Sequence, residues 1–251
     1  MIRSIFLIIL IIISTITKAS EQEECLEFHV IDNNHAGLKK SHKGNIGVHW
    51  EYLEALERET GFCINKTILP NKRIWQSLKE GKHDGGIMFK SDLHPNIVEY
   101  VALIHTVKTI VIPIVGVDIQ HYKDLYELTI GKPRGISLSE TFDHDPQLNI
   151  IELNHYAQAI QMIKLGRLDA IAGCATALDY HLKTFSALNK VNYKNKLDLG
   201  KKEQWLQFSK KSKHLDKIPL FEKAIEKLRL DGTFNLIMDK YYGEQWNLIN
   251  K

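Results

Sequence analysis

Short runs typical of β-strands alternate with amphipathic segments typical of helices along most of this sequence. Residues 26–30, 64–69 and 84–89 are strand-like. Between them lie two segments with a helical stripe of apolar residues, 47–60 and 70–80, and each is followed by a glycine, which often ends a helix. The order strand, helix, strand, helix, strand predicts a right-handed parallel α/β unit, and sheets of this kind place ligand sites at the carboxyl ends of their strands.

A second α/β unit begins near Ile110. Residues 109–117 are β-branched and are interrupted by Pro113, so we expect an edge or crossover strand there rather than a central one. Residues 132–140 are typical of a strand that gives way to a glycine turn and a helix capped by serine. The other predicted elements are strands at 149–153 and 168–174 and helices at 157–165, 219–230 and 234–241. No low-complexity linker joins the two units, which favours two lobes that face each other across a cleft.

The first 19 residues differ in character from the rest. Arg3 gives a positive start, residues 5–13 are an unbroken apolar run, and residues 17–19 fit the small-x-small pattern of a cleavage site. A membrane-spanning helix needs roughly 20 apolar residues, so this run is too short. We therefore predict a secretory signal peptide over 1–19 and a periplasmic protein that is soluble after cleavage; the alternative is an uncleaved anchor.

Charge and motifs exclude several classes of function. Removal of residues 1–19 takes away Arg3 and Lys18 and leaves 31 basic and 30 acidic side chains, a balance that gives no reason to expect nucleic acid or an anionic membrane surface as a partner. The densest histidine cluster, residues 143–145, lacks the paired spacing of a metal site. Neither G-x-S-x-G nor H-E-x-x-H is present. We therefore expect no metal and no cofactor.

Two of the three cysteines stand at equivalent places. Cys25 and Cys63 each open a predicted strand, and if those strands are parallel neighbours, both thiols lie at the same end of the sheet, where a disulfide is geometrically possible. The alternative is a pair of unbonded, buried thiols.

Four segments, taken in order, resemble the extracellular solute-binding protein family 3. They are residues 47–61, the P-x-K-R and L-x-x-G-x-x-D-G elements within 69–85, the G-R-x-D-A element within 165–170, and the D-G-T and Y-x-G elements within 228–243. The resemblance implies the type II periplasmic binding fold, with two α/β lobes joined by two crossovers and a ligand cleft between them. Lobe 1 would hold residues 24–108 and 204–251, and lobe 2 residues 110–203.

The resemblance also implies two charged contacts to an amino-acid ligand, an Arg after the third strand and an Asp after the G-R-x-D-A strand. Asn96 and Cys174 stand at these positions. An asparagine cannot replace a bidentate guanidinium, and cysteine is a poor partner for an ammonium group. The sequence is closer to a divergent branch of the family.

Candidate ligand contacts follow the predicted strands toward the cleft. Each has a structural alternative: a turn for Asp32 and His35, a surface cation for Arg73, core packing for Phe89 and Cys174, and plain helix capping for the serines. The predicted ligand-binding residues are Asp32, His35, Arg73, Phe89, Lys90, Ser91, Arg134, Gly135, Ser137 and Cys174.

We therefore predict a monomeric, non-enzymatic periplasmic protein. It would capture a small polar solute, amino-acid-like or an organic anion, for the membrane permease of an ABC-type importer. One alternative is an enzyme on the same fold, similar to cyclohexadienyl dehydratase, in which Lys90 or His35 would serve as acid or base. Another is the ligand-sensing subunit of a membrane receptor.

Overall fold

The computed structural model describes residues 24–32, 38–40, 44–91, 96–244 and 246. The predicted signal peptide and His35 lie outside this part of the chain. Among the helices of the described residues, none combines the length and the apolar character needed to cross a membrane.

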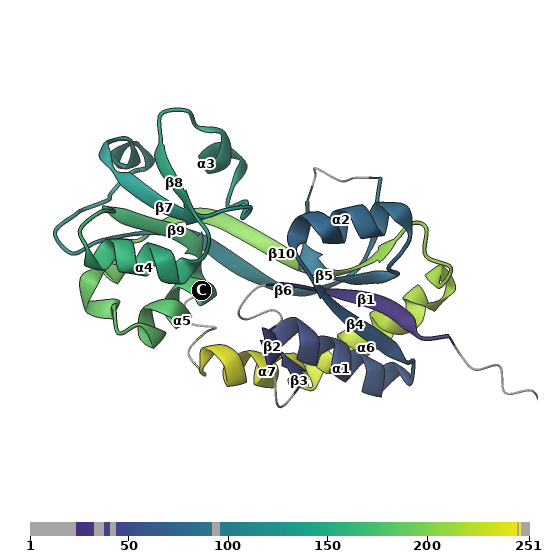
Figure 1. Cartoon of the computed structure of the whole chain (residues 1–251). Coiled ribbons are helices and arrows are strands. Elements are labelled where there is room, and N and C mark those ends of the chain that lie inside the picture. Colours follow the sequence, from purple (N-terminus) through teal and green to yellow (C-terminus); the bar gives the residue numbers. More distant parts are fainter. Residues whose placement is uncertain (1–23, 33–37, 41–43, 92–95, 245, 247–251) are drawn as a thin grey trace, which may run out of the picture.

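One eight-stranded mixed sheet organises the molecule, in the order β4-β1-β5-β10-β6-β9-β7-β8 (Figure 1). Its strands are β1 (Leu26–Ile31), β4 (Ile64–Leu69), β5 (Gly85–Phe89), β6 (Val98–Pro113), β7 (Thr129–Pro133), β8 (Asn149–Leu153), β9 (Ala170–Cys174) and β10 (Leu197–Ser209). Two short strands, β2 (Leu38–Lys40) and β3 (Gly44–Ile46), form a separate antiparallel pair. The long strands β6 and β10 are the two central strands of the sheet. They pair with each other and extend from one half of the molecule into the other.

Helices cover the sheet in two separate groups, which we call the lobes. In lobe 1, the strands β4, β1 and β5 pack with α1 (Val48–Thr60), α2 (Asn71–Glu80), α6 (Ile218–Leu230) and α7 (Thr233–Tyr242). In lobe 2, the strands β9, β7 and β8 pack with α3 (Glu140–His144), α4 (Tyr156–Lys164) and α5 (Ala175–Thr184). Figure 1 shows α2 on one side of the lobe 1 sheet and α1, α6 and α7 on the other. This is the predicted α/β architecture of two lobes joined by two crossover strands.

The hydrophobic cores of the two lobes do not merge within the described residues. One core of lobe 1 takes Ile104 of β6 and Leu206 of β10 as its members nearest to lobe 2. The cores of lobe 2 begin at Ile110 of β6 and at Leu199 of β10, the latter partly buried. The middle of β6 and β10 therefore belongs to none of these hydrophobic cores. The lobe boundaries expected from the sequence fall in this middle part.

Several helix ends are set by residues that the sequence analysis singled out. Gly61 and Gly81 end α1 and α2 in the left-handed conformation, with φ of 76° and 75°. The side chain of Ser139 accepts a hydrogen bond from the backbone N–H of Phe142 and caps α3. Local propensity and capping thus agree with the fold at these positions.

The predicted strand at 109–117 was wrong in extent and in position. The strand β6 starts at Val98 and ends at Pro113, and it lies inside the sheet between β10 and β9. Proline lacks a backbone N–H, and here it is the last residue of the strand, so the sheet loses little. The prediction of a crossover was correct, whereas the alternative of an edge strand was not.

A disulfide joins Cys25 and Cys63, with Cα atoms 4.6 Å apart. These cysteines directly precede β1 and β4, which are parallel neighbours with Leu26 opposite Ile64. The bond therefore ties the two strands together at their amino ends, the ends that face away from lobe 2.

Candidate ligand-binding site

The carboxyl ends of the parallel strands in the two lobes face each other. In lobe 1, β5 runs antiparallel to β10 and ends with Phe89 opposite Gln204. In lobe 2, β9 runs antiparallel to β6 and ends with Cys174 opposite Thr109, which in turn lies opposite Gly200. Three residues of β10 lie between these two ends, and the four steps from Gly200 to Gln204 cover about 13 Å in a strand.

We call the paired segments 106–108 and 201–203, which span this interval, the bridging ribbon. Ligand sites in parallel α/β sheets lie beyond the carboxyl ends of the strands. The space next to the bridging ribbon is where two such sets of strand ends meet, so it is the candidate site.

On the lobe 1 side, Lys90 is fixed by the ribbon and by two aromatic rings. Its backbone N–H donates to the carbonyl of Glu203 at 2.8 Å. Its ammonium nitrogen lies 5.6 Å from the ring centre of Tyr100 and 5.5 Å from that of Trp205. Both contacts are of the cation–π type and hold the charge beside the ribbon.

The backbone of Ser91 is held by Tyr100. Its N–H donates to the hydroxyl oxygen of Tyr100 at 3.1 Å, and the same hydroxyl donates to the Ser91 carbonyl at 3.0 Å. Tyr100 therefore anchors the start of the loop after β5, which begins with Phe89 half-buried and Lys90 exposed.

The other predicted residues of lobe 1 lie at neighbouring strand ends. Asp32 follows β1 and is exposed, and its N–H donates to the carbonyl of Leu69 at the end of β4. Arg73 is exposed in the first turn of α2. Asn96, at the position where the family resemblance places an arginine, is exposed in a turn before β6. No hydrogen bond joins the side chains of Asp32, Arg73 and Lys90 within the described residues.

The loop after β7 directs several of its donors to an internal carboxylate. The Asp143 side chain accepts from the Lys132 ammonium at 2.9 Å, the Ser137 hydroxyl at 2.8 Å and the backbone N–H of Leu138 at 2.7 Å. Lys132 and Asp143 are both largely buried, with 11% and 12% of their side chains exposed. Ser137 was predicted to bind the ligand, whereas in the structure its hydroxyl donates to a carboxylate of the chain itself.

Arg134 and Gly135 lie at the exposed tip of that loop. The Arg134 guanidinium is 67% exposed and pairs with Glu152 at 3.5 Å. Gly135 has a φ of 75°, which suits glycine better than other residues. These two residues shape the loop, and the Arg134 charge is already balanced.

Cys174 ends β9 and stands directly before α5. Its backbone N–H donates to the hydroxyl of Tyr156 at 3.1 Å. Burial raises the pKa of the thiol to about 12, so the side chain is neutral at physiological pH. A neutral thiol cannot balance the charge of a bound ammonium group.

Two polar residues of β10, Lys202 in the bridging ribbon and Gln204 next to it, were not predicted from the sequence. Lys202 donates from its ammonium group to the Ser137 hydroxyl at 3.1 Å. Gln204 is buried, and its amide oxygen lies 3.2 Å from Nε2 of His49 in α1. Because alternate residues of a strand share a face, Lys202 and Gln204 project to the same side. The sequence offers one weak signal for this part of the chain, the two glutamines among apolar residues in 204–208. It does not mark a site unless the pairing of β10 with β6 is known.

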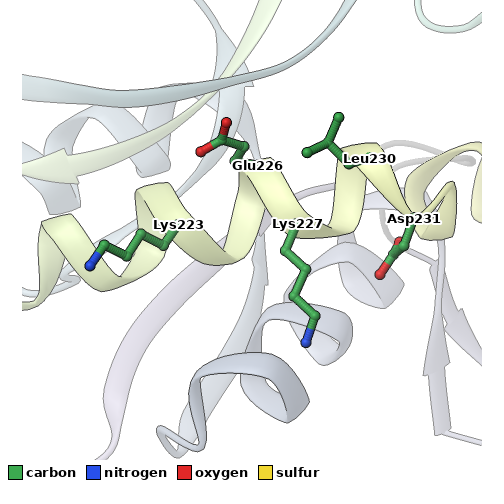
Figure 2. Close-up of a pocket in the computed structure, with 5 residues that line it drawn as sticks. All are labelled: Lys223, Glu226, Lys227, Leu230 and Asp231. Atoms are coloured by element: carbon green, nitrogen blue, oxygen red, sulfur yellow. The ribbon is translucent and has the colours of Figure 1, made fainter.

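Two hollows at the surface lie at α6, away from the bridging ribbon. Figure 2 shows one of about 460 Å³ on the outer face of α6, lined by Lys223, Glu226, Lys227, Leu230 and Asp231. A second of about 250 Å³ adjoins it, at the contact of α6 with the end of α1. Neither contains a residue predicted for ligand binding, and Lys227 already pairs with Glu59 at 2.8 Å.

Comparison with known proteins supports the fold through structure and not through sequence. No protein-family model matches the chain, and no curated protein matches it. Several solved structures resemble it over most of its length, all at low sequence identity. They have the Venus flytrap or type II periplasmic binding fold, and this chain has that fold.

Three of these structures illustrate the range. The periplasmic VFT2 domain of Bordetella pertussis BvgS is 17% identical, with a TM-score of 0.69 and coverage of 86% of this chain and 93% of that one. The second substrate-binding domain of a putative amino acid ABC transporter from Streptococcus pneumoniae is 21% identical, with a TM-score of 0.64 and coverage of 87% and 100%. An ancestral arginine-binding protein bound to arginine is 18% identical, with a TM-score of 0.67 and coverage of 87% and 98%.

Proposed function

We propose that this chain is an exported, periplasmic solute-binding protein. It would take up a small polar solute beside the bridging ribbon and deliver it to the permease of an ABC-type importer. The observation that carries the proposal is the meeting of two sets of strand carboxyl ends across a ribbon that belongs to neither core.

This arrangement suits capture of a solute by lobe closure. Each lobe has its own hydrophobic core and can stay rigid, while a few residues of two strands connect them. Small backbone rotations in such a connection change the distance between two facing surfaces. Solved structures of the same fold include substrate-binding domains of amino acid transporters, which agrees with this role.

We further propose that the protein does not catalyse a reaction. Covalent catalysis needs a nucleophile activated by a base. Burial raises the pKa of the Cys174 thiol at the candidate site. Burial also raises the pKa of the neighbouring Tyr156 hydroxyl well above that of an ordinary tyrosine. Within the described part of the chain, neither group is paired with an ionised base.

Ligand-dependent thermal stabilisation tests the proposal. A ligand that binds only the folded state raises its stability by mass action, by about 2.7 kcal/mol at one hundred times the dissociation constant. We expect members of a panel of amino acids, carboxylic acids and small peptides to raise the melting temperature. A native mass spectrum of protein purified without refolding should show the same compound retained. A panel without effect, together with a mass spectrum of the bare chain, would contradict the proposal.

A sensory role is the second candidate, because the VFT2 domain of BvgS shares the fold with a TM-score of 0.69. Both roles require ligand binding, so they differ only in the membrane partner. Crosslinking in intact cells followed by mass spectrometry separates them, since a permease would be recovered for transport and a receptor for sensing. Incubation with prephenate-like compounds tests the enzymatic alternative, and we expect them to remain unchanged.

A further inference from the structure

Lys202 occupies the middle of the bridging ribbon. On β10 it lies two residues from Gln204, which marks the end of β5, and two residues from Gly200, which lies opposite Thr109 beside the end of β9. Its side chain reaches to the loop after β7, where the ammonium nitrogen is 3.1 Å from Ser137 Oγ. The residue is partly exposed, so its remaining N–H donors can be reached by a small molecule.

Three acidic groups on β10 and on α3, which follows the loop that Lys202 contacts, are engaged by other cations or donors. Asp143 pairs with Lys132 at 2.9 Å, and Asp198 pairs with Lys108 at 3.0 Å. Glu203 accepts from the indole N–H of Trp205 at 3.0 Å.

No carboxylate on the same strand face is paired with Lys202 within the described residues. Glu203 projects from the opposite face of the strand, because neighbouring residues alternate. Within the described residues, Lys202 therefore has no direct carboxylate partner and reaches Asp143 only through the Ser137 hydroxyl.

Neutral polar groups surround this charge. The Cys174 thiol is buried and lies close enough to Lys202 to be affected by its charge. On the same face as Lys202 and Gln204, the buried His49 has no hydrogen-bond partner at Nδ1 within the described residues. A buried polar atom without a partner is costly and often marks a place that receives a ligand or water. Burial lowers the pKa of His49 to about 4, so this ring is neutral at pH 7; its one N–H lies at Nε2 and donates to the Gln204 amide oxygen, which leaves Nδ1 as an acceptor.

We infer that Lys202 is the anion-binding residue of the site and that the solute is a small carboxylate without an α-ammonium group. This inference rests on the proposed function and specifies its substrate class. A carboxylate that accepts from the N–H groups of Lys202 not directed at Ser137 gains a charge-assisted hydrogen bond, while the Ser137 hydroxyl remains a donor to Asp143. An α-ammonium group at the same place meets a cation and a neutral thiol, so an ordinary amino acid binds less well.

Isothermal titration of three proteins tests the inference: the wild type, Lys202→Gln and the matched control Lys201→Gln. Lys201 is exposed and adjacent, and it projects from the opposite face of the strand. The probes are succinate, glutarate and citrate on one side, and L-arginine and L-glutamine on the other. We expect at least one carboxylate to bind the wild type more tightly than either amino acid. Lys202→Gln should weaken that binding at least tenfold, and Lys201→Gln should weaken it less than twofold.

Two results would overturn the inference and leave the proposed function intact. One is tighter binding of L-arginine or L-glutamine than of any carboxylate. The other is carboxylate binding that Lys202→Gln and Lys201→Gln weaken equally. If no probe binds and the wider thermal panel is also silent, the proposed function fails and this inference fails with it. Circular dichroism of each variant checks that a loss of binding is not a loss of fold.

Discussion

At the scale of single residues, three buried histidines of lobe 1 set the response to pH. Burial lowers the pKa of His29 and of His105 to about 3 and that of His49 to about 4, from an ordinary value of 6.5. Neither ring nitrogen of His29 has a hydrogen-bond partner within the described residues. The folded chain therefore keeps these rings neutral at a pH where the unfolded chain protonates them.

The first prediction is a loss of stability in mild acid. Since the unfolded state binds more protons below pH 6.5, the stabilising effect of the three neutral rings is complete above that pH. It falls as the pH drops toward 4, by about 1.4 kcal/mol per pH unit for each histidine. Denaturant titrations at pH 7.5, 6 and 5 measure the slope. The pKa of His181 in lobe 2 is also lowered by burial, to about 4, so His29→Leu should lower the slope between pH 6 and 5 by about a quarter. An unchanged slope would show that His29 does not titrate on unfolding.

A second residue-scale prediction concerns the glycine beside Cys174. A Cβ at Gly173 would lie 2.5 Å from the Tyr156 ring, whose hydroxyl holds the Cys174 N–H. Gly173→Ala should therefore lower the stability by about 2 kcal/mol through overpacking, seen as a melting temperature lower by about 4–8 °C. Adding Tyr156→Leu should recover part of the loss. Equal effects of Gly173→Ala with and without Tyr156 would rule out this clash.

At the scale of elements, the disulfide and the ligand site lie at opposite ends of the lobe 1 strands. Cys25 and Cys63 are 38 residues apart, and closing a loop of this size in the unfolded chain contributes about 3–4 kcal/mol in the chain-entropy account. The double variant Cys25→Ser, Cys63→Ser should therefore melt at a temperature lower by about 10 °C and still bind its ligand with unchanged affinity at 25 °C. Cys174→Ser, a thiol outside the bond, is the control for stability. Loss of affinity in the double variant would show that the amino ends of β1 and β4 influence the site.

Several elements that were predicted from the sequence, such as α1 and α2, have a regular apolar pattern, whereas β10, which was missed, does not. The predicted bounds of α1, β4, α2 and β8 agree with the structure to within a residue or so. The segments of α1 and α2 end at glycine and that of β4 at proline. The strand β10 was missed because its first half alternates exposed charges such as Asp198 and Lys201 on the connection between the lobes. Only pairing with β6 reveals it as a strand.

The same reason limits what the sequence could say about the site. Lys90 and Ser91 were predicted because they directly follow a recognisable strand, and in the structure the Lys90 backbone N–H donates to Glu203 of the ribbon and Tyr100 holds the Ser91 backbone. Lys202 and Gln204 belong to the strand that was missed, so no local pattern marked them. Asp143, which takes the donors of Ser137 and Leu138, is separated from them by a helical turn that the sequence pattern does not orient.

At the scale of the whole molecule, the lobes touch at a second place besides the ribbon. The helix α7 of lobe 1 contacts α5 of lobe 2. The rings of Tyr242 and Tyr180 lie 6.3 Å apart in an edge-to-face arrangement. Tyr242 ends α7 and also packs against the lobe 1 core. An aromatic pair of this kind contributes about 0.5–1.5 kcal/mol beyond the area it buries. Such an energy is small for the fold but large for a balance between two lobe arrangements.

The last prediction follows from that balance. If the Tyr242–Tyr180 contact favours the lobe arrangement described above, its loss shifts the population of that arrangement by about fivefold for each kcal/mol. Tyr242→Ala should therefore increase the radius of gyration of the ligand-free protein in small-angle X-ray scattering, whereas Tyr242→Phe, which keeps the ring, should not. Saturating ligand should bring the radius of gyration of the Tyr242→Ala protein back to the wild-type value. A ligand that contacts both lobes beside the bridging ribbon favours their approach. A radius of gyration equal in all three proteins, with and without ligand, would mean that the bridging ribbon alone fixes the lobes.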